Sequence, residues 1–428
     1  MKILSTSLRE YPPLLTILGN KNPSSFCGWL YASSKSLLEI DSSLELGILS
    51  ITPKLKKWEK YQSGRFTFYR IPSKGLHKVT KNEIQMAKEI LNDFHPDIIQ
   101  LNGTEYSLGL EIIEANTNNI PIIATIQGLS FVYERYNQGN ISLWNFYKNL
   151  TFRDIIKMDG QLHRNKVMYK RGIIEKNIIK NIKYITGRTT WDKDHAKTIN
   201  PKIQYFTCNE NLRSNFYTSE KWNFNNCTPF SIFCSNGSVP LKGAHYLIKA
   251  MQIVVSIFPQ ARLRIIGPNV LSKDIRFKIR LTSYQKYLKK LILKLHLENN
   301  IQFLGFLSEQ EMIKEYLNAN VYVLPSCIEN SPNSLCEAQI LGVPCISSIC
   351  GGTTDFINHN IDGFLYRCEE YEQLAQIIME IFKLKEKISN ISSKAINKAI
   401  MRHNREMNAR QLLNIFSNIL KESQKSRQ

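Results

Sequence analysis

The segment 327–344 restricts the possible folds most, because it predicts a strand, a loop and a helix in close succession. The apolar run 321–325 before it is typical of a buried strand, and 335–341 is typical of a short helix that ends at the following Gly-Val-Pro. Glu329 then lies in the loop after the strand, and Glu337 on the first turns of the helix. Ligands of open α/β sheets bind beyond the carboxyl ends of the strands, so this loop is the expected binding site.

The chemistry of this loop suits a nucleotide sugar. A helix that opens at residues 332–334 would leave the amides around Ser334 and Leu335 without partners inside the helix, which favours a diphosphate. Since a carboxylate can accept two hydroxyl hydrogen bonds, Glu329 is the candidate for the transferred sugar and Glu337 for the ribose. Taken alone, the spacing favours a simpler interpretation, in which Glu337 complements the helix dipole and Glu329 is solvated.

Several motifs around the two glutamates form a recognisable set. They are Asn330-Ser-Pro-Asn-Ser-Leu, Glu337-Ala, Gly342-Val-Pro and Gly351-Gly, with further runs that begin at Ile185, Glu210, Leu263, Phe303 and Asp362. Together they resemble the family-four retaining glycosyltransferases, of the type that builds bacterial surface polysaccharides. The resemblance implies the GT-B fold, in which two doubly wound Rossmann-like domains face a cleft. It also implies a nucleoside-diphosphate sugar as substrate and no metal or other cofactor.

Lys242 is the third candidate of the donor site, because it follows the strand-like run 230–235 and precedes a helix-like run at 244–250. A lysine at this point could neutralise the charge on a diphosphate leaving group, although it could equally be a solvated lysine at a helix start. Relatives usually carry an arginine five residues earlier, where this chain has Gly237. They often have two glycines near the donor phosphates, where this chain has Cys27 and Gly28.

The resemblance thus implies two sets of site residues. Glu329 and Lys242 are the catalytic candidates. The donor would be bound by Gly28, Asn236, Lys242, Gly267, Glu329, Asn330, Ser334, Leu335 and Glu337. The acceptor side would be lined by Trp29, Asn102, Glu105 and Gln127, of which the last three follow the strand-like runs 97–101 and 121–126. Relatives often have histidine at the position of Gln127, and glutamine cannot act as a base.

Length and patterning predict two α/β domains. A chain of 428 residues with 43% hydrophobic residues can bury two cores, and apolar strands alternate with helices along it. The expected parts are an acceptor-side domain at 1–205, a linker at 206–228, a donor domain at 229–395, and a last segment at 396–428. In that last segment a helix at 409–420 crosses back to the first domain, and residues 421–428 form an unstructured tail.

Cysteine usage and the chain start favour the cytoplasm. The nine cysteines include no Cys-x-x-Cys pair and none at zinc-finger spacing to a histidine, so no structural metal is expected. The first residues resemble a strand rather than a signal peptide, and no run is long enough to span a membrane.

The formal net charge of +20 is concentrated in two basic runs, 157–183 and 273–294, which are interleaved with apolar residues. Such runs can lie on an anionic membrane surface, as on the inner face of the cell membrane, or they can cover the domain's own core with a solvated basic face. We weigh these two interpretations equally. Nucleic acid is not expected, since no nucleic-acid-binding motif accompanies the charge.

The predicted function is therefore transfer of a sugar from a nucleoside-diphosphate sugar to a surface-polysaccharide or lipid-linked saccharide acceptor, with retention of configuration. Two alternatives stay open at this point. One is a nucleotide-sugar epimerase of the same fold, which would need further acid and base groups. The other is a protein that binds sugar nucleotides without catalysis, having lost the arginine.

Overall fold

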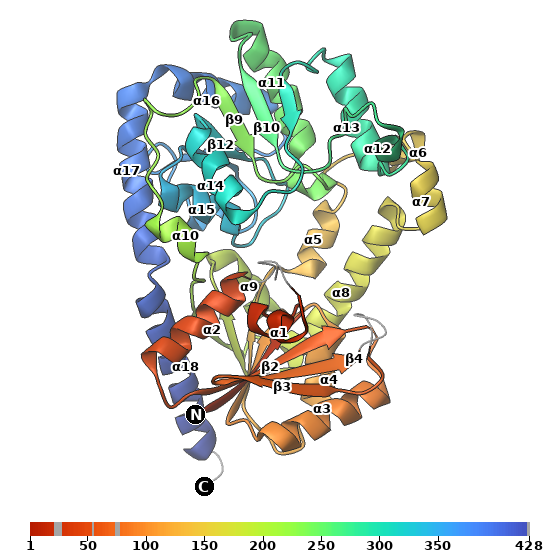
Figure 1. Cartoon of the computed structure of the whole chain (residues 1–428), viewed down its shortest axis with the longest axis vertical. Helices are drawn as coiled ribbons and strands as arrows, with labels where there is room; N and C mark the ends of the chain where they lie inside the picture. The colour runs from red at the N-terminus through yellow and green to blue at the C-terminus, as the bar shows by residue number, and fades with distance from the viewer. Residues whose placement is uncertain (21–27, 54, 73–77, 426–428) are drawn as a thin grey trace. The chain divides into compact units, whose positions relative to one another are not determined.

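The computed structural model describes residues 1–20, 28–53, 55–72 and 78–425, and its chain forms two compact α/β units (Figure 1). Unit 1 consists of Met1–Phe131, Tyr169–Arg213 and His403–Gln428, and unit 2 of Val132–Met168 and Ser214–Arg402. Each unit is built on one sheet of its own. The prediction of two α/β domains with parallel sheets is confirmed.

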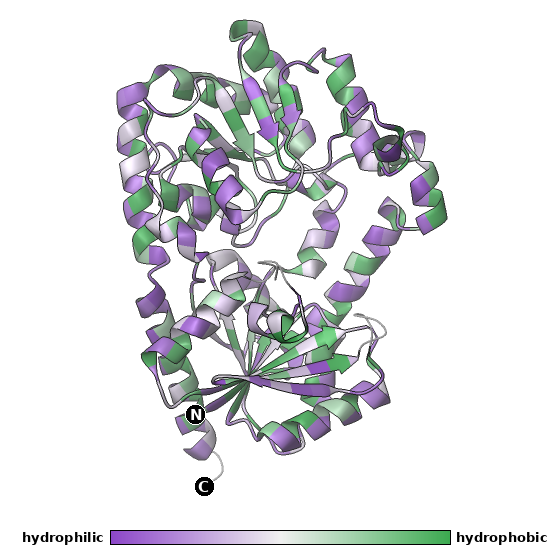
Figure 2. Cartoon of the chain, in the orientation of Figure 1, coloured by the Kyte–Doolittle hydropathy of each residue, from purple (hydrophilic) through white to green (hydrophobic). Residues whose placement is uncertain are grey.

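The sheet of unit 1 has the strand order β3-β4-β2-β1-β5-β6-β7-β8. All neighbours are parallel except β3 and β4, which form an antiparallel hairpin. The exposed alternation of β3 suits an edge strand, and Figure 2 shows it as hydrophilic beside the hydrophobic β4. The strands are β1 Lys2–Ser7, β2 Glu45–Thr52, β3 Glu59–Ser63, β4 Phe66–Pro72, β5 Ile98–Asn102, β6 Ile122–Thr125, β7 Tyr184–Gly187 and β8 Gln204–Thr207.

Helices α2 and α18 cover the sheet of unit 1 and pack on it through apolar side chains. Leu37 of α2 and Phe416 of α18 belong to the same buried core as Ile3 of β1. The helices are α1 Pro12–Ile17, α2 Gly28–Ile40, α3 Lys81–Phe94, α4 Ser107–Ala115, α9 Thr190–Ile199 and α18 Arg405–Lys425. Two further helices, α5 Ser130–Tyr136 and α8 Gln161–Asn181, have residues in both units.

Unit 2 contains a wholly parallel sheet in the order β11-β10-β9-β12-β13-β14, the doubly wound pattern expected from its alternating elements. Its strands are β9 Ser231–Cys234, β10 Arg262–Ile265, β11 Ile301–Phe303, β12 Val321–Leu324, β13 Cys345–Ser348 and β14 Phe364–Tyr366. Its helices are α6 Leu143–Lys148, α7 Phe152–Lys157, α10 Ser214–Thr218, α11 Ala244–Ile257, α12 Ile275–Lys278, α13 Ser283–Lys294, α14 Glu309–Asn318, α15 Asn333–Leu341, α16 Tyr371–Lys383 and α17 Lys385–Arg402, with 3-10 turns η1 Pro240–Lys242 and η2 Thr353–Asp355.

The units are not divided by a single point in the sequence. The segment 132–168, expected in the first domain, packs with unit 2, and the chain passes from unit 1 to unit 2 again at Arg213. The last helix, α18, belongs to unit 1 and continues to Lys425, so the expectation of an unstructured tail from residue 421 was wrong for 421–425. Residues 426–428 lie outside the described part.

Two buried glutamates meet between α3 and α4 of unit 1. Glu83 and Glu111 are 3% and 2% exposed, and Thr80 donates a hydrogen bond to Glu83. Burial and the neighbouring Glu83 carboxylate raise the pKa of Glu111 to about 8. This carboxyl group therefore holds a proton at neutral pH.

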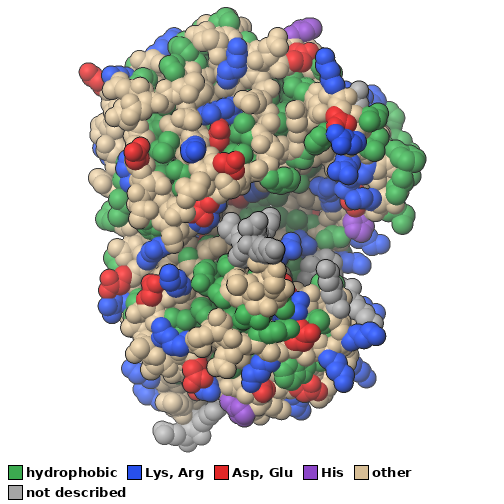
Figure 3. Space-filling model, in the orientation of Figure 1, with side chains coloured by type: hydrophobic (Ala, Val, Ile, Leu, Met, Phe, Trp, Pro, Cys, Tyr) green, Lys and Arg blue, Asp and Glu red, His purple; other side chains and the backbone are tan. Residues whose placement is uncertain are grey.

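The surplus of positive charge is spread over both units, with a concentration over α12 and α13 (Figure 3). Among the described helices, none is both long and apolar enough to cross a membrane.

Candidate functional site

A cavity of about 180 Å³ opens in unit 2 at the carboxyl ends of β9 and β12. This is the position where open α/β sheets bind ligands. The cavity is lined by Cys234, Ser235, Asn236, Lys242, Met312, Leu324, Pro325, Ser326 and Ser334. Three of the predicted donor-site residues, Asn236, Lys242 and Ser334, thus meet at one cavity although 98 residues of chain separate the first from the last.

An ion pair joins the two catalytic candidates. Lys242 Nζ lies 2.6 Å from Glu329 Oε1, and Ser326 Oγ donates to the same oxygen at 2.7 Å. The Glu329 side chain is 7% exposed and the Lys242 side chain 27% exposed. The carboxylate is therefore held by two donors, while the ammonium keeps contact with the cavity, where it can still donate hydrogen bonds to an anion.

Two glycines allow the loops of this site to approach one another. Gly243 has a φ of 68°, and a Cβ there would lie 1.7 Å from the Pro325 carbonyl oxygen. Gly351 has a φ of 50°, and its Cβ would lie 1.9 Å from the Glu329 carbonyl oxygen. Only glycine combines a left-handed conformation with contact this close, so both residues fix the backbone that carries Lys242 and Glu329.

Two tyrosines donate hydrogen bonds to the start of α15. Tyr322 donates from its hydroxyl to Ser334 Oγ at 2.9 Å, and Tyr316 donates to the Ser334 carbonyl at 2.8 Å. The Leu335 amide donates to the Pro332 carbonyl at 3.0 Å. The prediction that the Leu335 amide lacks a partner was therefore wrong, because a tight first turn satisfies it. The Ser334 amide, at the second helical position, has no helical carbonyl one turn earlier to which it could donate.

The other predicted donor residues are not among the described lining of this cavity. Glu337 is 5% exposed on α15, and Asn330 is 1% exposed in the loop before it. Gly267 follows β10 and pairs with Gly305. Gly28 begins α2 in unit 1, and Cys27 of the same motif lies outside the described residues.

The position of the missing arginine is tightly packed. Gly237 is not in the left-handed region, but a Cβ there would lie 2.5 Å from Cγ2 of the buried Ile265. Its amide donates to the Ile266 carbonyl at 3.0 Å. A side chain at this position would therefore have to displace the core of the sheet.

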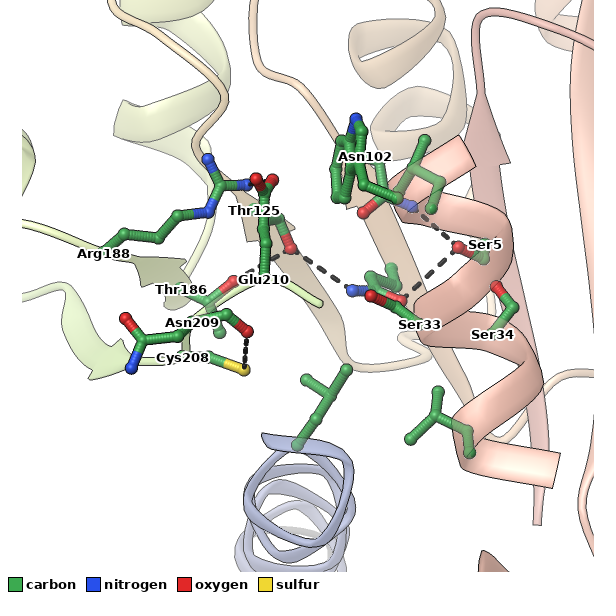
Figure 4. A pocket seen from close by; sticks show the side chains of 15 residues that line it. Ser5, Ser33, Ser34, Asn102, Thr125, Thr186, Arg188, Cys208, Asn209 and Glu210 are labelled. Carbon is green, nitrogen blue, oxygen red and sulfur yellow. Dashed lines mark hydrogen bonds and ion pairs between the residues drawn. The ribbon is translucent and has the colours of Figure 1, made fainter. Parts of the chain in front are cut away.

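In unit 1, a polar hydrogen-bond chain crosses the sheet beneath α2 (Figure 4). It runs from Thr186 through Thr125, Gln100 and Ser5 to Asn102, with distances between 2.8 and 3.4 Å. Both N–H bonds of the Asn102 amide are used, on Ser5 Oγ and on the Thr6 carbonyl. Asn102 therefore offers its carbonyl oxygen, rather than its amide hydrogens, to a ligand.

A small cavity in unit 1 is lined by residues of this hydrogen-bond chain, by Trp29 and by a buried ion pair. Arg188 lies 5.4 Å from the centroid of the Trp29 ring, and it pairs with Glu210. Figure 4 shows the end groups of Arg188 and Glu210 side by side. Sequence reasoning did not select Arg188 or Glu210 as site residues, although both belong to segments that resemble the family. Ser326, which holds Glu329, was missed as well.

Glu105 and Gln127 meet beside Gly103. Atoms of both side chains lie within 3.6 Å of the point where a Cβ of Gly103 would stand. Burial raises the pKa of Glu105, although the nearby Arg171 opposes this shift.

A second carboxylate stands in the same neighbourhood. Glu175 accepts hydrogen bonds from Thr104 at 3.0 Å and from the Phe131 amide at 3.1 Å. Burial and then the charge of Glu105 raise the pKa of Glu175 well above its usual value. The four predicted acceptor-side residues thus form two pairs in unit 1, one in the cavity and one at Gly103.

Comparison with known proteins finds a family match within unit 2. Residues 218–398 match the family described as Glycosyl transferases group 1. A GDP-mannose-dependent monoacylated alpha-(1-6)-phosphatidylinositol monomannoside mannosyltransferase of Corynebacterium glutamicum is 28% identical over 171 residues, which are 38% of this chain and 40% of that protein. A UDP-Gal:alpha-D-GlcNAc-diphosphoundecaprenol alpha-1,3-galactosyltransferase of Escherichia coli is 27% identical over 158 residues, 36% of each chain. The chain thus spans less than half the length of these two relatives.

Solved structures extend the likeness of fold to the whole chain. A sucrose-phosphate synthase from Thermosynechococcus elongatus has a TM-score of 0.68 at 15% identity, with 98% of this chain and 99% of that chain covered. Anabaena HepE, in complex with UDP and glucose, has a TM-score of 0.64 at 16% identity, with 97% and 99% covered. The chain therefore has the fold of the GT-B glycosyltransferases and contains, over residues 218–398, a glycosyltransferase domain of group 1.

Proposed function

We propose that this chain is a retaining glycosyltransferase that moves a sugar from a nucleoside-diphosphate sugar to a polysaccharide or lipid-linked saccharide acceptor. The observation that carries the proposal is the cavity of unit 2, where Lys242 is paired with Glu329 and faces the start of α15. Relatives of the matched domain are named as enzymes that use GDP-mannose or UDP-galactose. No observation favours the epimerase alternative.

In this proposal the diphosphate lies between Lys242 and the first turn of α15. The leaving oxygen gains negative charge as the bond to the sugar breaks, and a fixed ammonium together with a helix N-terminus stabilises that charge. Glu329 has two functions: it orients Lys242 through the 2.6 Å contact, and its carboxylate accepts hydrogen bonds from the hydroxyls of the transferred sugar. Glu337 holds the ribose. None of these steps requires a metal, and we propose that the enzyme works without one.

The acceptor would bind to unit 1, where Trp29, Asn102, Glu105 and Gln127 offer an aromatic face and polar groups. Two relatives are named for acceptors with lipid parts, a phosphatidylinositol mannoside and a diphosphoundecaprenol saccharide. We therefore propose that the enzyme acts from the cytoplasm at the inner face of the cell membrane.

Separate variants of the two glutamates test this assignment. Nucleotide affinity is measured by calorimetry with UDP and GDP, and transfer with labelled nucleotide sugars. Glu337→Ala should weaken nucleotide binding by about 1.5–3 kcal/mol, since a charged hydrogen-bond partner of the ribose is lost. Glu329→Ala should reduce turnover and weaken nucleotide binding less than Glu337→Ala does, since Glu329 acts on the nucleotide only through Lys242.

Glu311→Ala provides the control, because this glutamate caps α14 and does not line the cavity. Equal loss of nucleotide affinity in both site variants would mean that the two roles are misassigned. If the wild type binds nucleotide tightly but transfers sugar to no acceptor, the proposal is replaced by the non-catalytic alternative. Gly237, in place of an arginine, is the feature that supports that alternative.

A further inference from the structure

Unit 2 exposes a group of large apolar side chains on α6, on α7, in the turns that follow these two helices, and at the start of α8. Exposed fractions reach 74% for Phe152 and 77% for Met158. We call this group the apolar face; it consists of Leu143, Trp144, Tyr147, Leu150, Phe152, Ile155, Ile156, Met158 and Leu162. Figure 3 shows hydrophobic side chains gathered over these helices, at the edge of the view. A continuous apolar patch of this kind is uncommon on the surface of a soluble protein and marks an interaction site.

The apolar face is exposed because the opposite side of the two helices is already occupied. Phe146 and Asp154 are 5% and 4% exposed. The Ser283 amide donates to Asp154 Oδ2 at 2.7 Å, and Lys286 Nζ donates to the Leu150 carbonyl at 3.1 Å. These contacts fasten both helices to α13, so the exposed side chains belong to a firmly packed element.

The basic run 273–294 divides into two parts with different environments. In α13 the apolar positions cover the core of unit 2, with Leu288 and Ile292 fully buried. For α13, the interpretation as a solvated basic face over a core is therefore correct. In and beside α12, however, Ile275, Phe277 and Ile279 are 66%, 47% and 59% exposed. The segment around α12 thus exposes a second set of apolar side chains besides the apolar face, and α13 follows α12 in the chain and contacts α6 and α7.

Positive charge surrounds these side chains. Residues 143–168 and 273–294 contain thirteen Lys and Arg and only three acidic residues. All three acidic residues are engaged by arginines: Asp154 and Asp159 by Arg153, and Asp274 by Arg276. A partner of this surface therefore meets an excess of cations and exposed apolar groups together.

Aromatic residues on α6 have the character of a membrane interface. Trp144 and Tyr147 stack at 6.2 Å between ring centroids, and Lys148 Nζ lies 5.2 Å from the Trp144 ring. Tryptophan and tyrosine collect at the headgroup level of bilayers, and lysine can bury its stem while its charge stays in water. A largely apolar cavity of about 260 Å³ also opens within this group, between Phe146, Tyr147, Met158 and Leu162.

We propose that the apolar face inserts shallowly into the headgroup region of an anionic bilayer, with α12 and the surrounding lysines and arginines on its surface. Apolar burial and attraction to anionic lipids act together in this kind of binding, and neither is sufficient alone. The inference deepens the proposed function, because a lipid-linked acceptor would be met at that surface, but the binding itself requires no catalysis.

The test is flotation of the full chain with vesicles of phosphatidylcholine alone and of phosphatidylcholine mixed with phosphatidylglycerol. We expect binding to the mixed vesicles, little binding to the neutral ones, and loss of binding as salt is raised. Phe152→Glu with Ile156→Glu should lower partitioning at least about tenfold. Lys148→Gln with Lys157→Gln should lower it by a similar factor, since each cation contributes separately.

The matched control is Ile257→Glu with Ile361→Glu, which adds the same charge at apolar side chains that are 57% and 51% exposed outside the apolar face. It should bind vesicles as the wild type does. UDP affinity, measured in parallel, should be unchanged in all variants, so a failure of vesicle binding is distinguished from a failure of the proposed function. Equal binding to neutral vesicles, equal loss in the control, or a dimer of the free chain that Phe152→Glu dissociates would each overturn the inference.

Discussion

Removal of the Lys242 ammonium should reduce both stability and catalysis, because the same contact serves both. Glu329 is held by Lys242 at 2.6 Å and by Ser326 at 2.7 Å, and only 7% of its side chain is exposed. Lys242→Met leaves this buried carboxylate with the hydroxyl alone. Loss of one hydrogen bond to a charged group is worth about 1.5–3 kcal/mol. The 27% exposure of Lys242 keeps the effect below the ~3–5 kcal/mol of a fully buried pair.

A double variant separates the ion pair from the individual charges. Lys242→Met with Glu329→Gln removes both charges, so it should unfold at a higher urea concentration than Lys242→Met alone. Turnover should fall by about a hundredfold or more in the single and double variants alike, since both lack the cation that faces the leaving group. Urea denaturation gives the free energy of unfolding, and transfer rates are measured far below the unfolding midpoint.

Lys398→Met is a matched control for this experiment. Lys398 pairs with Asp362 at 2.8 Å, and the two side chains are 27% and 4% exposed, much as in the Lys242–Glu329 pair. Its loss should lower stability by a similar amount and leave turnover per folded molecule unchanged. Full turnover of Lys242→Met would refute the catalytic assignment. A double variant no more stable than Lys242→Met would refute the coupling of the two charges.

Three further outcomes are expected. Gly351→Ala should abolish transfer and lower the melting temperature more than Gly64→Ala, which has a similar φ of 56° but open space around it. Glu111→Gln should flatten the pH dependence of stability. The folded wild type keeps the Glu111 proton up to about pH 8, so its free energy of unfolding falls as the pH rises from 4.5 to 8. At pH 8 the variant should therefore have the larger free energy of unfolding in urea denaturation. Gly237→Arg should lower the melting temperature without raising turnover, because its Cβ meets Ile265 at 2.5 Å; an unchanged melting temperature with faster transfer would contradict this packing.

Much of the fold could be predicted from local pattern. Apolar runs bounded by glycine or proline correspond to real strands, such as β12 Val321–Leu324 for the predicted 321–325 and β9 Ser231–Cys234 for 230–235. Such strands are buried on both faces, so their continuous hydrophobicity is a strong signal. The end of α15 at Gly342 was predictable for a similar reason, because that glycine adopts a φ of 86° at the helix terminus.

Contacts between distant segments could not be predicted in the same way. The segment 132–168 packs with unit 2 through Asp154 and Leu150, and their partners Ser283 and Lys286 are more than a hundred residues away. Likewise, the motifs predicted Lys242 and Glu329 as separate site residues, but they did not predict the ion pair between these residues, which are 87 positions apart. The obstruction at Gly237 also depends on a neighbouring strand. Hydrophobic periodicity contains no information on which partner a polar group finds, so these features needed the three-dimensional structure.

The absence of the arginine is best understood from the rigidity of the donor loops. The Cys327 amide donates to the Leu241 carbonyl at 2.9 Å, and the Gly352 amide to the Glu329 carbonyl at 3.0 Å. These contacts fix the loops of the two catalytic candidates to the neighbouring backbone. A fixed cation needs no reorganisation when charge develops on the leaving group, which is the condition under which electrostatic stabilisation is most effective. A single well-held lysine, with the N-terminus of α15 facing the same cavity, is therefore sufficient for the transfer that we propose, without the arginine that the family resemblance leads one to expect.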